Sequence, residues 1–136
     1  MYPEEMVKPM RAELTDAGFQ ELLNASSVSD YLKNEGTTLI VINSVCGCAA
    51  RNARPAAKMS LEHDKKPNQI ATVFAGVDSE AVAAVREHLF PFPPSSPCIA
   101  LFKDGELVHM LERHHIEGRP AELISENLKD AYSQYC

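Results

Sequence analysis

The sequence contains no long apolar run, no excess of positive charge and few cysteines, and each of these features excludes a class of protein. No run approaches the roughly 20 apolar residues that a membrane-spanning helix needs. The 136 residues carry a formal net charge of −6, which argues against a nucleic-acid or acidic-membrane partner. The four cysteines are too few and too unevenly spaced for the disulfide framework of a small secreted protein.

The N-terminal stretch also lacks the marks of a secretory signal. Met1 to Glu5 contains neither a basic segment nor the start of an apolar one. We therefore expect a cytoplasmic protein. The length and the 45% apolar composition suit one domain over residues 1–136 with a substantial core.

The most informative stretch is LIVINSVCGC, which runs from Leu39 to Cys48. Its first four residues are apolar without alternation, which predicts a strand covered on both faces of a sheet. Two cysteines follow, and the composition after Cys48 favours a helix. The first turn of a helix has free backbone N–H groups and the positive end of the helix dipole, and both favour a thiolate. The stretch therefore predicts two reactive thiols at a strand-to-helix junction.

The rest of the chain alternates between helical and strand patterns. The predicted elements, in chain order, are a helix to about residue 16, a weak edge strand at 19–23, a helix that stops at Gly36, a strand at 37–42, a helix after Cys48, a strand at 70–75, a helix from 78 or 79, a hairpin of strands 98–102 and 107–111, and a helix from Pro120. Strand–helix–strand units imply parallel strands, and the hairpin adds antiparallel ones. A three-layer α/β/α domain with a central mixed sheet follows, which is the thioredoxin-like layout.

Two expectations concern the helices near the N-terminus. Met6, Met10 and Leu14 are spaced four apart and are predicted to face the core. Ser26 or Ser27 is predicted to cap the second helix.

Two further expectations concern residues near the predicted thiols and after the hairpin. Pro55 lacks a backbone donor and should kink the helix that follows Cys48. His114 and His115 follow the hairpin, and on a strand they would point to opposite faces, which makes them a poor metal-chelating pair. No glycine-rich phosphate loop and no Ser/His/Asp arrangement is recognisable.

The spacing of Cys46-Gly47-Cys48 indicates a working disulfide rather than a structural one. A disulfide needs Cα atoms roughly 4.4–6.8 Å apart, whereas two extended residues span about 6.6–7 Å. A turn or the start of a helix therefore suits the bond better, and Gly47 is expected to supply unusual backbone angles. Closing so short a loop adds little stability, so the bond should be easily made and broken.

Positive charge gathers after the cysteines of this acidic chain. No acidic residue lies between Glu35 and Glu62, whereas Arg51, Arg54 and Lys58 do. Positive charge lowers the pKa of a thiol from its free value of about 8.5. Arg51 and Arg54 are thus candidates for tuning a thiolate, and the alternative is that they are solvated helix positions.

A proline-rich segment precedes the hairpin and ends in Ser96-Pro97. Dithiol proteins of this layout place a cis-proline loop here, beside the active cysteines, although only about 5–6% of X–Pro bonds are cis in general. We therefore predict a cis Ser96–Pro97 bond packed against the cysteine turn. Two thiolates can also bind zinc, copper or an iron–sulfur cluster, which leaves a metal or cluster carrier open at this point.

Several segments together resemble the bacilliredoxin family over essentially the whole chain. These segments are NSVCGCA (43–49), PSSP (94–97), LFKDGELVHM (101–110), ERH (112–114), IEGR (116–119), and the terminal MYP and YC. The resemblance implies a thioredoxin fold and the reduction of mixed disulfides between proteins and the small thiol bacillithiol. Some members of the family are described as thiol–disulfide isomerases.

The resemblance also implies roles for the cysteines. Cys46 would be the thiolate that attacks and accepts the bacillithiol moiety, and Cys48 would be the resolving thiol. No bound cofactor or metal is expected, and bacillithiol would be a thiol co-substrate. The partners would be bacillithiolated client proteins and, for recycling, an NADPH-dependent flavin disulfide reductase.

Two cysteines remain without an assigned role. Cys98 follows Pro97 and is either a third thiol that faces the site, which leaves metal binding open, or a small buried residue at a strand start. Cys136 is expected to be a terminal thiol, with a resolving or intermolecular role as the alternative. The predicted function is a thiol–disulfide oxidoreductase that removes bacillithiol, and the alternatives are a protein disulfide isomerase and a non-enzymatic thiolate metal or cluster carrier.

Overall fold

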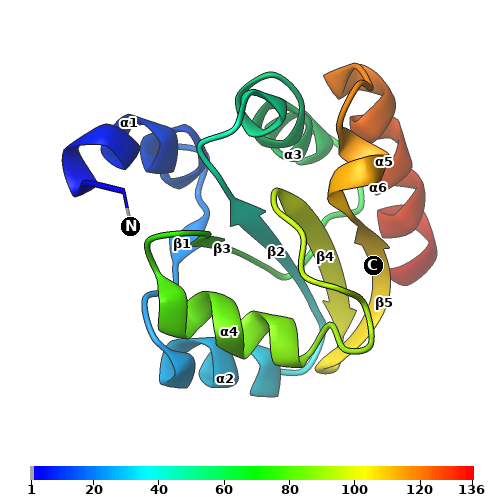
Figure 1. The fold of residues 1–136 in the computed structure, drawn as a ribbon. Coiled ribbons are helices and arrows are strands. Elements are labelled where there is room, and N and C mark those ends of the chain that lie inside the picture. Colours follow the sequence, from blue (N-terminus) through cyan, green and yellow to red (C-terminus); the bar gives the residue numbers. More distant parts are fainter. Residues whose placement is uncertain (1) are drawn as a thin grey trace.

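The computed structural model describes residues 2–136 (Figure 1). Its elements, in chain order, are α1 (Glu4–Thr15), β1 (Gln20–Glu21), α2 (Ala25–Lys33), β2 (Thr37–Asn43), the π-helical η1 (Ala49–Ala53), α3 (Arg54–Ser60), β3 (Gln69–Phe74), α4 (Ser79–Glu87), β4 (Cys98–Lys103), β5 (Glu106–Leu111), α5 (Arg113–Ile116) and α6 (Ala121–Tyr135). This order matches the predicted one, with the short helix α5 added after the hairpin. No helix of residues 2–136 has both the length and the apolar character needed to cross a bilayer.

The five strands form one mixed sheet in the order β1-β3-β2-β4-β5. β3 runs parallel to β1 and β2, whereas β4 is antiparallel to both β2 and β5. The sheet lies between two helical layers, as Figure 1 shows, so the predicted three-layer α/β/α architecture is confirmed. The β4–β5 hairpin turns at Asp104-Gly105, where both residues have positive φ, as the sequence suggested.

β2 is the central strand, and all seven of its residues are buried. Its run of apolar residues without alternation fits this position, because both faces of the strand are covered. Ile42, near the end of β2, pairs with Cys98 at the start of β4. This antiparallel register brings the segment before β4 next to the segment after β2.

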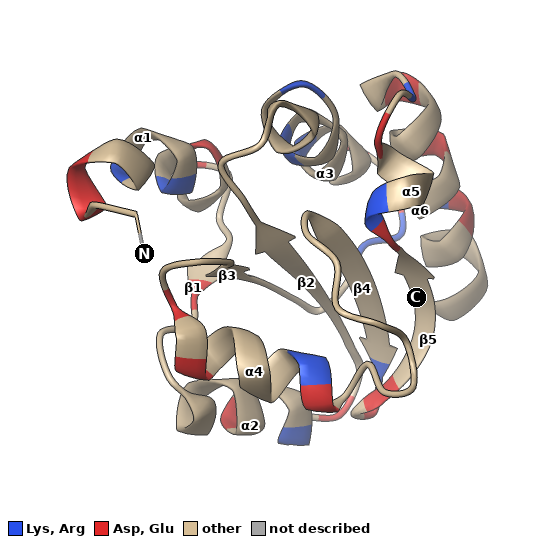
Figure 2. Ribbon diagram, viewed as in Figure 1, with Lys and Arg blue, Asp and Glu red and all other residues tan. Residues whose placement is uncertain are grey.

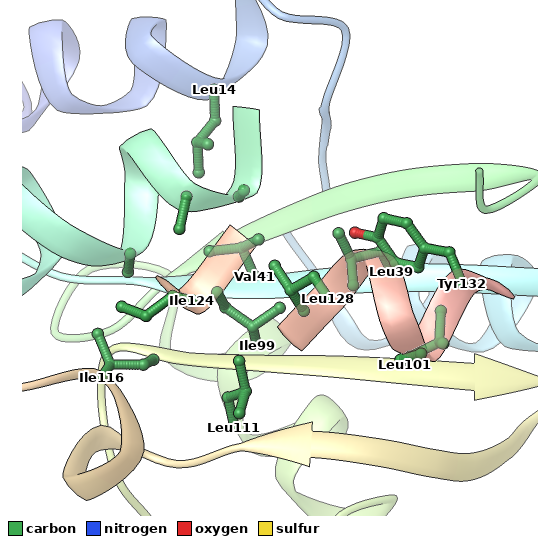
Figure 3. Close-up of a cluster of buried hydrophobic side chains, with 14 of the residues drawn as sticks. Leu14, Leu39, Val41, Ile99, Leu101, Leu111, Ile116, Ile124, Leu128 and Tyr132 are labelled. Carbon is green, nitrogen blue, oxygen red and sulfur yellow. The ribbon is translucent and has the colours of Figure 1, made fainter. Parts of the chain in front are cut away.

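The two faces of the sheet carry separate apolar clusters. The first lies under α1, α3 and α6, and its members labelled in Figure 3 include Leu14, Leu39, Val41, Ile99, Leu101, Ile124, Leu128 and Tyr132. The second lies under α2 and α4 and includes Val28, Leu32, Ile40, Ile42, Val73, Val82 and Val85. Burying each such side chain contributes about 1.5–3 kcal/mol relative to leaving it exposed. The two clusters hold the helices against the sheet, and the cysteine loop extends from the end of its central strand, β2.

The predicted apolar stripe of α1 is confirmed at Leu14 but wrong at Met6. Met6 is 45% exposed and Met10 is half-buried, and the buried face carries Val7 and Arg11 beside Leu14. Arg11 is buried because both of its terminal nitrogens lie 2.8 Å from the carboxylate of Asp78. A pattern of apolar residues cannot reveal that an arginine occupies the inner face, since the partner lies far along the chain.

The predicted cap of α2 is wrong, and the residue at the N-cap position of α4 does not cap that helix with its side chain. Asn24, not Ser26 or Ser27, is the N-cap of α2, and its side-chain oxygen accepts the N–H of Ser27 at 2.9 Å. Asp78 occupies the N-cap position of α4, but its carboxylate binds Arg11 rather than the helix. The local sequence offers several capping residues, and the tertiary partners decide between them.

The helix after the cysteines is irregular just before Pro55. The five-residue π-helical segment η1 ends at residue 53, and Pro55 then lies in the first turn of α3. Proline has no backbone N–H to donate to the preceding turn, and the change from π-helix to α-helix falls just before it. The kink at Pro55 stays a prediction.

Candidate functional site

Cys46 and Cys48 lie between the end of β2 and the helix that follows it. Helical backbone begins at Gly47 and continues through η1 and α3 to Ser60. The carbonyl oxygen of Cys46 accepts the N–H of Ala50 at 3.3 Å, which closes the first helical turn. The predicted strand-to-helix junction is confirmed, and Cys46 lies at the positive end of the helix dipole.

The two cysteines are joined in a disulfide, with their Cα atoms 5.4 Å apart. The start of a helix provides this separation, which extended chain does not. Gly47 is not in the left-handed region, so the expected unusual backbone angles are wrong. A Cβ at this position would lie only 2.8 Å from Nη2 of Arg51. The glycine thus leaves room for the Arg51 guanidinium over the cysteine turn.

The two cysteines of the disulfide differ in exposure to solvent. Cys46 is half-buried, whereas Cys48 is only 8% exposed. Two open clefts border Cys46, and we name them by their positions. The proline-side cleft, of about 360 Å³, is lined by Tyr2, Ser44, Cys46, Arg86, Ser96 and Arg113 among others. The helix-side cleft, of about 280 Å³, includes Cys46, Gly47, Cys48, Arg51, Arg113 and Glu117.

Arg54 holds the loop that leads to Cys46. Its side chain is 2% exposed, and Nη1 donates to Oδ1 of Asn43 at 2.8 Å and to the carbonyl oxygen of Ser44 at 2.9 Å. Nε forms an ion pair with Glu13 at 3.1 Å without hydrogen-bond geometry. Ser44 in turn accepts the N–H of Cys46 on its hydroxyl oxygen at 3.3 Å. The alternative of a solvated Arg54 is therefore wrong, and its hydrogen bonds go to the Asn43 side chain and the Ser44 backbone, just before Cys46.

Arg51 has a different environment. It is exposed, lies over Gly47 and lines the helix-side cleft together with both cysteines. Among residues 2–136 it has no ion-pair partner. Its charge is consequently available to a thiolate in this cleft, and its effect on a thiol stays a prediction.

The Ser96–Pro97 peptide bond is cis, as predicted, and Phe90–Pro91 is a second cis bond that was not predicted. Ser96 lines the proline-side cleft beside Cys46. Its carbonyl oxygen accepts a hydrogen bond from Nη1 of Arg113 at 3.3 Å. The loop with the cis-proline thus lies next to the cysteine turn. The antiparallel pairing of β2 with β4 places it there.

Arg86 and Arg113 are site residues that sequence reasoning did not identify. Both line the proline-side cleft, and Arg113 also borders the helix-side cleft. Arg113 forms an ion pair with Glu117 at 2.9 Å. Its position directly after β5, which pairs with the strand that follows Pro97, was a signal that could have found it. Arg86 lies on α4, and no local pattern indicates that it reaches Cys46.

Cys98 is completely buried and belongs to the core rather than to the site. Burial raises the pKa of the Cys98 thiol to about 12, against a smaller opposing effect of Arg86. It therefore supplies no thiolate near neutral pH, and the interpretation of Cys98 as a small buried residue holds. Cys136 is an exposed free thiol at the C-terminus.

His114 and His115 do not point to opposite faces, because they lie on the helix α5 and not on a strand. Their ring centroids are 4.0 Å apart, and one ligand atom from each, with one from Glu112, lies within 4.8 Å of the others. However, Nδ1 of His115 already accepts the backbone N–H of Glu112 at 3.0 Å. Glu112 and His115 together cap the N-terminus of α5, which is a structural role. The prediction that the two histidines point to opposite faces was wrong.

The sequence matches a protein family described as "Disulphide isomerase" over residues 2–136. It is 59% identical over 134 residues to a bacilliredoxin of Cytophaga hutchinsonii, a match that covers 98% of this chain and 99% of that protein. A bacilliredoxin of Halalkalibacterium halodurans is 55% identical over 136 residues, covering 99% of this chain and 94% of the relative.

Solved thioredoxins share the fold at low sequence identity. The oxidised thioredoxin of Plasmodium falciparum superimposes with a TM-score of 0.58 at 12% identity, over 85% of this chain and 99% of that one. The thioredoxin of Aeropyrum pernix gives a TM-score of 0.55 at 19% identity, over 80% of this chain and 84% of that one. The disulfide between Cys46 and Cys48 at the start of a helix, and the cis-proline loop beside it, agree with these matches. The chain therefore belongs to the bacilliredoxin family and is a thiol–disulfide oxidoreductase with a thioredoxin fold.

Proposed function

We propose that this protein removes bacillithiol from mixed disulfides on client proteins, with Cys46 as the attacking thiolate and Cys48 as the resolving thiol. One observation carries the proposal: the two cysteines form a disulfide in which Cys46 borders two open clefts while Cys48 is 8% exposed. A bulky mixed disulfide reaches the accessible sulfur first. The shielded sulfur is then close enough to displace what the first one has bound.

The reaction starts from the reduced dithiol. The Cys46 thiolate attacks the sulfur of the small thiol, the client–bacillithiol S–S bond breaks, and the client leaves as a thiolate that takes up a proton. Cys46 now carries bacillithiol. Cys48 loses its proton and attacks the Cys46 sulfur, which releases bacillithiol and forms the Cys46–Cys48 disulfide. Two electrons have passed from the dithiol to the client and the small thiol.

Recycling returns two electrons to the disulfide. Two molecules of bacillithiol reduce it and become bacillithiol disulfide, which an NADPH-dependent flavin disulfide reductase converts back to the thiol. No cofactor bound to this chain takes part. We also propose a cytoplasmic location, because the dithiol must be reduced again after every turnover and thiols are kept reduced in that compartment.

The surroundings of Cys46 support the attacking role. The helix that starts at Gly47 presents free backbone N–H groups and a positive dipole end to the sulfur. Arg51 adds a positive charge in the helix-side cleft. Both favour a thiolate at Cys46.

The two cysteines are separated by single substitutions. Cys46→Ser should abolish removal of bacillithiol from a client. Cys48→Ser should still attack but should keep bacillithiol on Cys46, because no neighbouring thiol remains to displace it. Mass spectrometry after incubation with a bacillithiolated protein measures this adduct, with a glutathionylated protein as the comparison. An adduct on Cys48 in an active Cys46→Ser variant would reverse the assignment, and full activity of both variants would refute it.

Protein disulfide isomerisation is a second candidate, and the description of the matching family as a disulphide isomerase favours it. An isomerase rearranges disulfides within a client and needs no net electron transfer. Refolding of a client with scrambled disulfides would measure this activity without bacillithiol. The metal-carrier alternative loses its third thiolate, because Cys98 is completely buried in the core and lies outside both clefts.

A further inference from the structure

The clefts around Cys46 are basic although the chain as a whole is acidic. The net charge is −6, yet the charged residues that line the proline-side cleft are Arg86 and Arg113. Arg51 lines the helix-side cleft. Figure 2 shows basic residues on α4, on α5 and ahead of α3, the segments that contribute these arginines. A local positive field of this kind attracts negatively charged ligands to the site.

Arg86 is the arginine whose position needs an explanation. Its Nε is buried and makes no hydrogen bond with any group of residues 2–136. No carboxylate in this part of the chain lies within ion-pair distance of it. An arginine nitrogen removed from water without a partner is unfavourable, so such groups normally have one. The guanidinium is thus free to bind a ligand in the proline-side cleft.

Two acidic side chains on the segments around this cleft are already engaged. The carboxylate of Asp78 binds Arg11 and also accepts the backbone N–H of Phe74 at 3.1 Å. The carboxylate of Glu117 binds Arg113. Neither neutralises Arg86. A planar guanidinium matches a carboxylate through two parallel N–H donors, a geometry that a hydroxyl or an ammonium group cannot match.

We infer that the proline-side cleft is an anion subsite in which Arg86, with Arg113 beside it, binds a carboxylate of the small thiol that Cys46 takes from the client. The inference rests on the proposed function, because the thiol concerned is the one transferred to Cys46. The cleft volume of about 360 Å³ suits a small molecule. The site consequently prefers small thiols that carry a carboxylate over neutral or cationic thiols of the same length.

A series of three mixed disulfides on one client protein tests this preference. The thiols are 3-mercaptopropionate, 2-mercaptoethanol and cysteamine, which share a two-carbon chain and end in a carboxylate, a hydroxyl and an ammonium group. Each rate of removal by the reduced protein is divided by the rate with dithiothreitol, which corrects for the intrinsic reactivity of each disulfide. We expect the carboxylate thiol to be removed about tenfold faster than the neutral one, equivalent to ~1.4 kcal/mol, with the cationic thiol slowest.

Variants separate a defined subsite from a general positive field. Arg86→Gln should remove the preference for the carboxylate, and Arg86→Lys should retain part of it because the charge remains. Arg51→Gln is the matched control: it removes one charge from the other cleft and should change all three rates by the same factor. Higher salt should weaken the preference of the native protein.

The outcomes that overturn the inference are distinct. Equal corrected rates for the three thiols, or a preference that survives Arg86→Gln, would refute the subsite while leaving thiol–disulfide exchange intact. A loss of preference in Arg51→Gln as large as in Arg86→Gln would show a general field and would also refute it. If the native protein removed none of the three thiols, the proposed function itself would fail. Retained removal of the neutral thiol by Arg86→Gln shows that this variant is folded.

Discussion

Arg54→Met should destabilise the protein strongly, although this arginine lies on the same helical segment as the exposed Arg51. Arg54 is 2% exposed and donates two hydrogen bonds, to Asn43 and to the backbone of Ser44. Methionine fills most of the same volume but can donate neither bond. The Ser44 carbonyl would then lose this donor in a buried place.

The magnitude follows from these contacts. A hydrogen bond to a charged group contributes about 1.5–3 kcal/mol, so two such bonds amount to at least ~3 kcal/mol. The ion pair with Glu13 adds less than ~1 kcal/mol, because the Glu13 side chain is 38% exposed and its charge is screened by water. Removing a buried charge offsets part of the loss. We expect a net loss of about 3 kcal/mol, or roughly 10 °C in Tm for a domain of this size.

Urea denaturation of the oxidised protein measures the effect, with Arg51→Met as the matched control. Arg51 is exposed and lacks an ion-pair partner among residues 2–136, so its substitution should change the free energy of unfolding by no more than ~0.5 kcal/mol. The slope with denaturant should be the same for both variants. A free energy of unfolding for Arg54→Met within ~1 kcal/mol of the native value would refute the reasoning, as would equal losses in both variants.

Three further predictions concern residues outside the cysteine pair. Cys98→Ala should leave bacillithiol removal intact, and iodoacetamide should label Cys136 in the folded protein but Cys98 only after unfolding, because burial raises the pKa of Cys98 to about 12; rapid labelling of Cys98 would contradict this. Tyr132→Phe should lower the free energy of unfolding by about 1 kcal/mol, since the buried hydroxyl loses its 2.9 Å hydrogen bond with Ser60; unchanged stability would argue against that bond. Burial lowers the pKa of His115, so the unfolded state binds this proton more readily, and stability should fall as the pH drops below about 6.5. The fall should be smaller in His115→Gln, and an unchanged pH dependence in that variant would exclude His115 as its source.

Local sequence patterns were sufficient where one segment's own residues decide its structure. The unalternating apolar run of β2 predicted a strand covered on both faces, and the Asp104-Gly105 pair predicted the tight hairpin. Cys46 at a helix start followed from the change of composition after the motif. The cis bond at Pro97 followed from the order of elements, because that order fixes which loop lies opposite the cysteines.

Patterns failed where a distant partner decided the outcome. Met6 is exposed and Arg11 is buried because Asp78, on another element, pairs with Arg11. Arg54 was expected to act on a thiolate or lie in solvent, and the structure buries it against Asn43. No sequence pattern near these residues indicates such partners, because a charged residue is buried only where the fold places an opposite charge or a hydrogen-bond acceptor next to it.

Patterns within single segments and the order of those segments were enough to predict the mixed sheet, its central strand and the position of the two cysteines. That Cys46 borders both clefts and is the more exposed cysteine, and which arginines surround it, became clear only from the packing of the elements. Arg86 reaches the proline-side cleft from α4. Cys98 is excluded from the site by the packing of the core. The exposure of each cysteine and the charge around it depend on side chains from several elements, and these become neighbours only when the sheet has formed.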